Sequence, residues 1–393
     1  MREHPTHTMR RTVALPLLLL ACSQTVTTAA TTDVPRADDR PLLPDAATPA
    51  PDVVAPTQDA APLPDDASAP VEDVPVTPVE DVPPSAPGDY TGNGPLPLRT
   101  VQGMFTAPPS TGCRGTLCNV IVSVTLPARG VEGRMAPWPL AVFSPGFSTA
   151  SSAYAVTVGR LASWGYVVVR YDLQGESFLN ASTHASLAAT HGALIDWVRL
   201  QGESGMLRGE VDASRVLAAG HSRGGKVAAL AATQDARILG VVGLDPVDSP
   251  PPLQMPSDDY PLASARLRAL SREVPMAVIG AEFGGRSAFG MPCAPTQYNY
   301  VTFFDAARGP GLEVVLREAG HGQFVDDDRA AAASAALCPT GSAMNETVRT
   351  VSRTLLVAWA ERTLRDVDVS RWVRGEWIQA RVADRTLSSV RRR

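Results

Sequence analysis

The sequence lacks several patterns that would assign it to a common class of binding protein. Its six histidines include no pair at the spacing of metal ligands, so we expect no metal site. No basic stretch is interleaved with aromatic residues, so we expect no nucleic-acid partner. The apolar run at 13–21 is too short to span a bilayer. We therefore expect a protein that works without a metal or another cofactor.

Large apolar side chains are scarce in the region 33–89, which contains no Phe, Trp, Ile or Met. This region holds 14 of the 35 prolines, and its 13 acidic residues and two arginines give a formal charge of −11. Such a segment cannot bury enough apolar surface to offset its ordering entropy. We expect residues 22–89 to form an extended, self-repelling tether. Residues 90–393 carry about +4, and much of that excess lies in Arg391–Arg393, which we expect to be a solvated tail.

Residues 1–21 are typical of a targeting segment. Arg10 and Arg11 precede the apolar run, and Leu19-Leu20-Ala21-Cys22 follows it. This arrangement resembles a bacterial lipoprotein signal, in which Cys22 would carry the lipid and anchor the protein in the membrane of the cell envelope. The alternative is an ordinary secretory signal, because Leu20 is not the most usual residue in that position. In both cases we expect the protein to leave the cytoplasm.

That compartment permits disulfides, and four cysteines follow Cys22. Cys113 and Cys118 are close enough in sequence to clip a hairpin-like loop, which would leave Cys293 to pair with Cys338. This connectivity is one of three that four cysteines allow.

The remainder of the chain predicts one large α/β domain at 90–366, followed by a basic C-terminal extension at 367–393 that the pattern does not place. Short apolar and β-branched runs predict strands at 96–105, 120–126, 140–144, 166–171, 216–219, 239–244, 276–280 and 313–316. Helical patterns occur at 153–164, 182–200, 298–308 and 345–361. Their alternation predicts a mostly parallel central sheet flanked by helices. Three prolines open 250–272, which predicts a small lid insertion after the sixth strand, partly helical from Leu262.

The stretch 216–230 is the most informative part of the chain. A short apolar segment enters a Gly-x-Ser-x-Gly turn at 220–224, and an Ala-rich stretch leaves it, as in the nucleophile elbow of an α/β-hydrolase fold. The two glycines are needed because Ser222 is held there in a strained conformation. We expect Ser222 to be a nucleophile and the N–H of Arg223 to stabilise an oxyanion. A P-loop is the competing interpretation, but Val227 stands where that motif needs Ser or Thr.

A serine hydroxyl needs a base within hydrogen-bond reach and an acid that orients the base. His321 is the strongest candidate base, because it lies in a Gly-His-Gly loop just after the last predicted strand. The other histidines are weaker candidates. The elbow directs the side chain of His221 away from the serine. His184 and His191 lie on or near a helix, and His4 and His7 belong to the targeting segment.

Three carboxylates are candidates for the acid, and all preserve the chain order serine, acid, histidine. Asp245 ends the strand after the elbow helix, Asp248 follows three residues later, and Glu282 comes just after the next strand. From position alone, Asp245 and Glu282 rank equally.

Four stretches resemble the chlorophyllases, a branch of the α/β-hydrolases: 220–226, 243–248, 293–304 and 320–328. The likeness as a whole covers roughly 138–330. The elbow alone is also similar to that of bacterial cutinase-like polyester hydrolases. The resemblance implies a catalytic triad of Ser222, Asp245 and His321, and so favours Asp245 over Glu282. In related hydrolases a Pro-Gly-aromatic turn supplies the second oxyanion donor, which implies the N–H of Phe147 in the turn 145–147.

These features predict a serine carboxylesterase of the cell envelope that cleaves esters of apolar compounds through an acyl-enzyme. We expect four phenylalanines to edge its pocket: Phe147, Phe283, Phe289 and Phe324. One alternative is a surface-binding lipoprotein on a catalytically degenerate hydrolase fold. Another is an acyltransferase or a polyester hydrolase that uses the same triad.

Overall fold

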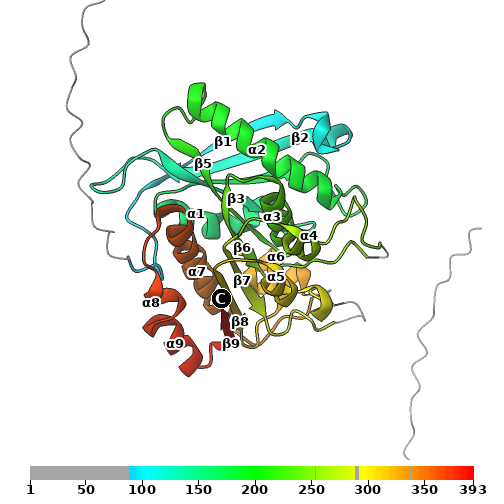
Figure 1. Cartoon of the computed structure of the whole chain (residues 1–393), viewed down its shortest axis with the longest axis vertical. Coiled ribbons are helices and arrows are strands. Elements are labelled where there is room, and N and C mark those ends of the chain that lie inside the picture. The colour runs from blue at the N-terminus through cyan, green and yellow to red at the C-terminus, as the bar shows by residue number, and fades with distance from the viewer. Residues whose placement is uncertain (1–87, 253, 288–291, 336–337) are drawn as a thin grey trace, which may run out of the picture. The chain divides into compact units, whose positions relative to one another are not determined.

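The computed structural model describes residues 88–252, 254–287, 292–335 and 338–393 (Figure 1). The expected targeting segment 1–21, the lipidation site Cys22, the tether up to residue 87 and Phe289 lie outside the described residues.

Within the described ranges, nine strands form one sheet in the order β1-β2-β4-β3-β5-β6-β7-β8-β9 (Figure 1). Strands β3 to β8 pair in parallel, and antiparallel pairs add β1, β2 and β9 at the two edges. The bounds are β1 Leu98–Thr106, β2 Asn119–Pro127, β3 Trp138–Ser144, β4 Val167–Leu173, β5 Val211–His221, β6 Ile238–Leu244, β7 Met276–Ala281, β8 Gly311–Leu316 and β9 Leu387–Arg392. Each of the eight expected strands is present, and the mostly parallel sheet confirms the expected fold class.

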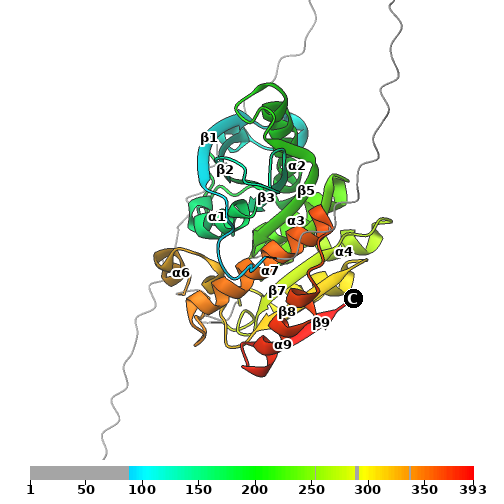
Figure 2. The same cartoon turned by 90° about the vertical axis from the view of Figure 1, so that its left-hand side faces the viewer.

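Helices cover both faces of this sheet (Figure 1; Figure 2). Helices α1, α7, α8 and α9 pack on one face, and α2, α3, α4 and α5 on the other. The bounds are α1 Ala155–Ser163, α2 His184–Ser204, α3 Arg223–Gln234, α4 Ala263–Ala269, α5 Tyr300–Ala306, α6 Asp328–Ser334, α7 Asn345–Arg365, α8 Ser370–Val373 and α9 Glu376–Ala383. Short 3-10 turns are η1 Pro109–Thr111, η2 Gly115–Cys118, η3 Ser151–Tyr154, η4 Thr296–Tyr298 and η5 His321–Phe324.

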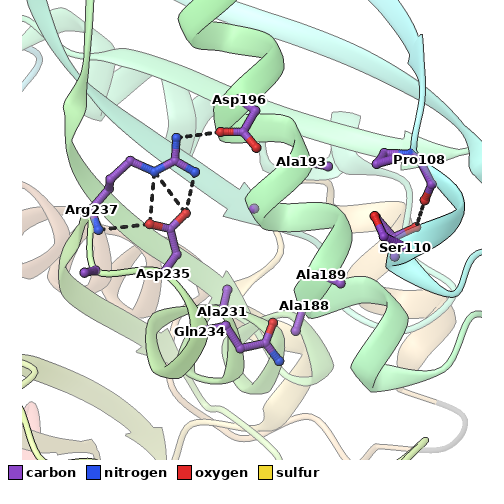
Figure 3. A pocket seen from close by; sticks show the side chains of 13 residues that line it. Pro108, Ser110, Ala188, Ala189, Ala193, Asp196, Ala231, Gln234, Asp235 and Arg237 are labelled. Carbon is purple, nitrogen blue, oxygen red and sulfur yellow. Dashed lines mark hydrogen bonds and ion pairs between the residues drawn. The ribbon is translucent and has the colours of Figure 1, made fainter.

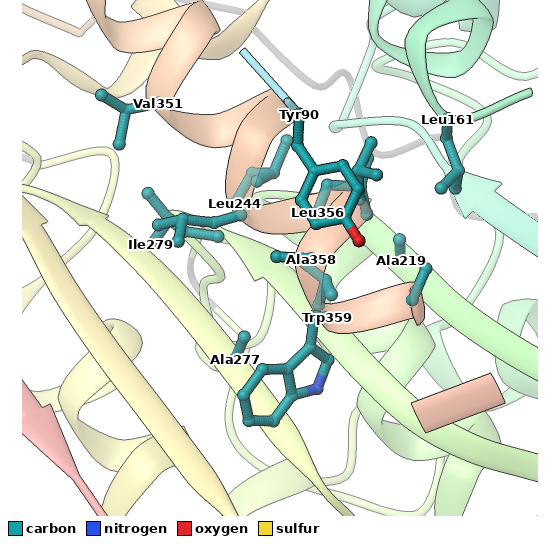
Figure 4. Close-up of a cluster of buried hydrophobic side chains, with 14 of the residues drawn as sticks. Tyr90, Leu161, Ala219, Leu244, Ala277, Ile279, Val351, Leu356, Ala358 and Trp359 are labelled. Carbon is teal, nitrogen blue, oxygen red and sulfur yellow. The ribbon is translucent and has the colours of Figure 1, made fainter. Parts of the chain in front are cut away.

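The core lies in two layers because the central strands are buried on both faces. In β3, Ala141 and Phe143 face the α7 side, whereas Leu140 and Val142 face the α3 side. Figure 4 shows the first layer, where Trp359 of α7 packs among aliphatic side chains of the sheet. Full burial of such a side chain contributes about 1.5–3 kcal/mol, so these layers hold the strand ends in fixed register.

The segment 367–393, expected to extend beyond the domain, packs against it. β9 pairs with β8 with Val390 opposite Val314, and Trp372 is fully buried beside Tyr90, with ring centroids 5.1 Å apart. Arg391 forms an ion pair with Glu313 of β8, with its Nε 2.6 Å from Oε1, so this arginine is not part of a solvated tail. The segment thus supplies the last strand of the sheet.

The insertion follows β6, the sixth strand, and contains α4. Ala263 and Leu267 of α4 are buried in the same cluster as α3 and α5, so this part of the insertion belongs to the helical layer.

Both disulfides have the expected connectivity: Cys113–Cys118, the short-range disulfide, and Cys293–Cys338, the long-range disulfide. No helix in the described residues is long and apolar enough to cross a membrane.

Candidate active site

Ser222 lies at the sharp turn between the end of β5 and the start of α3. Its φ of 56° and ψ of −123° are a strained combination for a residue with a side chain. A Cβ added at Gly224 would overlap the carbonyl oxygen of Ser144, and one at Gly220 would overlap the backbone of Gly224. Both glycines are therefore required for the close approach of β3 to the elbow, as the motif predicted.

A continuous chain of hydrogen bonds joins Ser222, His321 and Asp245. Nε2 of His321 lies 2.9 Å from the hydroxyl of Ser222, and Nδ1 lies 2.7 Å from a carboxylate oxygen of Asp245. The other oxygen of Asp245 accepts the N–H of Ala281 at 3.0 Å, and the residue is fully buried. The carboxylate is therefore fixed on both sides and can orient the imidazole.

The other two candidate acids have different partners. Glu282 accepts the backbone N–H of Glu318 at 2.7 Å in an exposed position. Asp248 accepts the N–H groups of Ala263 and Ser264, at 2.7 Å and 3.0 Å, where α4 begins. Neither carboxylate contacts His321, so the geometry brings only Asp245 to the histidine.

A buried lysine anchors the insertion beside the elbow. Lys226 of α3 is fully buried and donates to the carbonyl oxygens of Asp248 at 2.7 Å and Ser249 at 3.3 Å. Burial lowers the pKa of Lys226 to about 8 and raises the pKa of Asp248. Lys226 therefore ties the start of the insertion to α3, close to Ser222.

The two expected oxyanion donors lie in neighbouring loops. β3 and β5 are parallel, with Ser144 opposite Gly220, so the turn 145–147 leaves β3 beside the elbow. Within the described part of the chain, the N–H groups of Phe147 and Arg223 have no acceptor. Two backbone donors beside a serine hydroxyl form the arrangement that stabilises a tetrahedral oxyanion.

The side chain of Arg223 links the loops around these donors. Its guanidinium forms a two-pronged ion pair with Glu176, at 2.8 Å and 3.3 Å, and lies over the ring of Phe147, 5.1 Å from the ring centroid. The ring of Phe147 in turn lies 5.7 Å from that of Phe178. One side chain thus holds together the elbow, the turn 145–147, which is the expected oxyanion turn, and the loop after β4.

The chlorophyllase family profile matches residues 124–374, well over half of the chain. This chain belongs to the chlorophyllase family. Chlorophyllase-2 of Arabidopsis thaliana is 27% identical over 209 residues, which are 49% of this chain and 62% of that relative. Chlorophyllase-1 of Arabidopsis thaliana is 28% identical over 243 residues, 59% of this chain and 68% of the relative. Chlorophyllase-1 of Citrus unshiu is 26% identical over 232 residues, 56% and 66% of the two chains.

The chlorophyllases are a family of ester hydrolases with the α/β-hydrolase fold, and the match covers less than two thirds of the length of Chlorophyllase-2. The matched range begins within β2 and ends just after α8, so it contains Ser222, Asp245, His321 and the long-range disulfide. The short-range disulfide precedes the match.

The sequence analysis did not single out three residues near this site: Gly284, Phe178 and Leu179. A Cβ at Gly284 would lie 2.6 Å from a carboxylate oxygen of Asp245, so this glycine makes room for the acid. Phe178 and Leu179 are 68% and 94% exposed, although both are large and apolar. Their loop follows β4, and the contact between Phe178 and Phe147, together with the Arg223–Glu176 ion pair, places it beside the turn 145–147.

The phenylalanines expected to edge a pocket do not share one environment. Phe147 and Phe283 are half-buried, and the guanidinium of Arg286 lies over the ring of Phe283. Phe324 is buried behind the site, where its ring stacks on His221 with centroids 5.7 Å apart, so it does not edge a pocket.

A hollow of about 410 Å³ lies elsewhere, between α2, α3 and η1 (Figure 3). At one end Arg237 is already paired with Asp235 and Asp196, and half of the other ten lining residues are alanines. Its lining includes neither Ser222 nor His321. The described residues also contain no group of side chains able to hold a metal ion.

Proposed function

We propose that the chain is a serine hydrolase that cleaves carboxylic esters of apolar compounds through an acyl-enzyme. The observation that supports it is the unbroken chain from the Ser222 hydroxyl through His321 to the buried Asp245, at 2.9 Å and 2.7 Å. Such a chain raises the nucleophilicity of serine because the imidazole accepts its proton and the carboxylate stabilises the imidazolium.

The reaction follows from these positions. Ser222 Oγ bonds to the ester carbonyl carbon while its proton passes to Nε2 of His321, and the N–H groups of Phe147 and Arg223 hold the oxyanion. His321 then protonates the alkoxide oxygen as its bond to carbon breaks, and the alcohol leaves. Water repeats the attack on the acyl-enzyme with His321 as base, which releases the acid and restores Ser222. Each backbone donor is worth on the order of 100-fold in turnover.

The surroundings of the site support an apolar substrate. Phe178, whose ring lies 5.7 Å from that of Phe147, and its neighbour Leu179 are exposed to solvent. Exposed apolar groups of this size are stabilised when a ligand covers them. The names of the relatives refer to chlorophyll, which is one apolar ester of this class.

The test is turnover of p-nitrophenyl butyrate by the purified chain and by Ser222→Ala. We expect turnover in the wild-type protein and a loss of at least about 1,000-fold in the variant. A fluorophosphonate probe should label the wild-type protein and not Ser222→Ala. An unlabelled, folded wild-type protein would favour a binding protein on a degenerate hydrolase fold. Esters of increasing acyl length, a polyester film and a chlorophyll then define the substrate.

We further propose that the enzyme works in the cell envelope, anchored through lipid on Cys22. This rests on the sequence at 19–22 and on the acidic, proline-rich region that follows it. Labelled palmitate should be incorporated into the full chain and not into Cys22→Ser. Incorporation into neither, with release of the wild-type protein into the medium, would favour the secretory alternative.

A further inference from the structure

A buried chain of hydrogen bonds joins two loops of the active site from behind. Nε2 of His221 lies 3.0 Å from the main-chain carbonyl oxygen of His321. Nδ1 of His221 lies 2.8 Å from the hydroxyl of Tyr154, which in turn lies 3.2 Å from the backbone nitrogen of Gly146. The side chains of His221 and Tyr154 are 4% and 0% exposed. The chain therefore runs, shielded from water, from the loop of the base to the oxyanion turn.

For a neutral His221, one placement of the protons satisfies these contacts. A carbonyl oxygen can only accept, so Nε2 of His221 carries the hydrogen and Nδ1 is an acceptor. The hydroxyl of Tyr154 donates to that Nδ1 and accepts the N–H of Gly146. Burial lowers the pKa of His221 well below its usual value and raises the pKa of Tyr154. Both side chains are therefore neutral near pH 7, and the direction of the chain is fixed.

Close packing surrounds these hydrogen bonds. The ring of His221 packs against the rings of His321 and Phe324, with centroids 4.7 Å and 5.7 Å away. A Cβ added at Gly146 would lie 3.0 Å from the hydroxyl of Tyr154 and 3.2 Å from Nδ1 of His221. Glycine at 146 thus lets both side chains reach the oxyanion turn.

We propose that His221 and Tyr154 are positioning residues that set the His321 main chain and the oxyanion turn 145–147 relative to each other. The assignment rests on the proposed esterase function. Gly146 directly precedes Phe147, so the bond from its N–H to Tyr154 fixes the 145–146 peptide, which is next to the peptide that carries the second oxyanion donor. The neutral state of His221 also matters, because a second positive charge beside His321 would oppose its protonation during the reaction.

The test compares Tyr154→Phe with Tyr166→Phe. Tyr166 is also fully buried and donates its hydroxyl to Glu361 at 3.0 Å, in a network that contains none of the site residues. We expect Tyr154→Phe to lower kcat about 10-fold or more with KM unchanged, because misplaced donors weaken transition-state stabilisation. Its affinity for an alkyl trifluoromethyl ketone, which forms an oxyanion on Ser222, should fall by the same factor. Tyr166→Phe should retain kcat within two-fold, with a similar loss of thermal stability.

Substitution of His221 gives a second, independent measurement. Glutamine can donate to the His321 carbonyl and accept from Tyr154, whereas leucine can do neither. We expect His221→Gln to retain at least about ten times the kcat of His221→Leu. The assignment is overturned if Tyr154→Phe keeps kcat within two-fold of the wild-type value, or if both tyrosine variants lose the same factor. Absence of turnover in the wild-type protein and in Tyr166→Phe would instead overturn the proposed function.

Discussion

Three histidines are buried in neutral form, and acidification should therefore destabilise the folded protein. Burial lowers the pKa of His184 to about 2 and the pKa of His191 to about 4, and it also lowers the pKa of His221. In the unfolded chain each titrates near pH 6.5. The unfolded state therefore binds more protons than the folded state below that pH. The free energy of unfolding is largest above pH 6.5 and decreases as the pH falls below it.

The magnitude follows from the two numerical values. Between pH 7.5 and pH 5.5, His184 and His191 stay neutral in the folded protein but become protonated in the unfolded chain. Protonation of one histidine in the unfolded chain lowers the free energy of unfolding by about 1.4 kcal/mol over this range. The two histidines together should therefore lower it by about 3 kcal/mol. His221 adds to this loss, whereas the raised pKa of Asp248 opposes it. A loss of this size is a large share of the 5–15 kcal/mol that usually stabilises a domain.

Urea unfolding followed by tryptophan fluorescence at pH 7.5, 6.5 and 5.5 measures this loss. The matched variant is His184→Gln/His191→Gln, which has no titrating group at either position. We expect the variant to be less stable at pH 7.5 but to lose most of the dependence on pH. A change below about 1 kcal/mol in the wild-type protein would refute the reasoning, and so would an unchanged slope in the variant.

Three further outcomes follow from the site and its supports. Asp245→Asn should lower kcat on a p-nitrophenyl ester by about 1,000-fold or more, whereas Glu282→Gln should leave it within two-fold. Loss of the long-range disulfide in Cys338→Ser should cost about 4 kcal/mol in urea unfolding, against about 2 kcal/mol for the short-range disulfide in Cys118→Ser, because it closes a longer loop. Phe178→Ser should raise KM several-fold for octanoate esters but not for acetate esters; equal effects on both would contradict an apolar contact.

The elbow and the succession of strands and helices along the chain follow from the sequence because both depend on local patterns. Gly-x-Ser-x-Gly between an apolar run and an Ala-rich run leaves few alternatives. The choice between Asp245 and Glu282 could not be made from position, since both follow adjacent parallel strands. The structure separates them by backbone detail: Asp245 has a φ of 38° and Gly284 leaves space for its carboxylate. Neither feature appears in the pattern of apolar residues.

The last strand was not predicted for a different reason. Six residues, Leu387–Arg392, contain two apolar side chains and two arginines, which is a weak strand signal and resembles a solvated tail. Their pairing with β8 joins residues more than 70 positions apart. Glu313 could have indicated this pairing, because it is a carboxylate in an otherwise apolar strand. A buried carboxylate needs a cationic partner, and Arg391 provides one.

The convergence of the site depends on strand register more than on any single loop. Ser222, Asp245 and the oxyanion turn each follow a parallel strand, and Gly220 lies opposite both Ser144 and Gly243 in the sheet. A shift of one residue in either pairing would displace a loop by about 3.3 Å, whereas catalysis is lost when reacting groups are misplaced by about 1 Å. The sheet therefore brings the groups into the same neighbourhood, and the remaining precision must come from hydrogen bonds between loops. This is why two buried side chains that touch neither substrate nor nucleophile, His221 and Tyr154, should influence the rate.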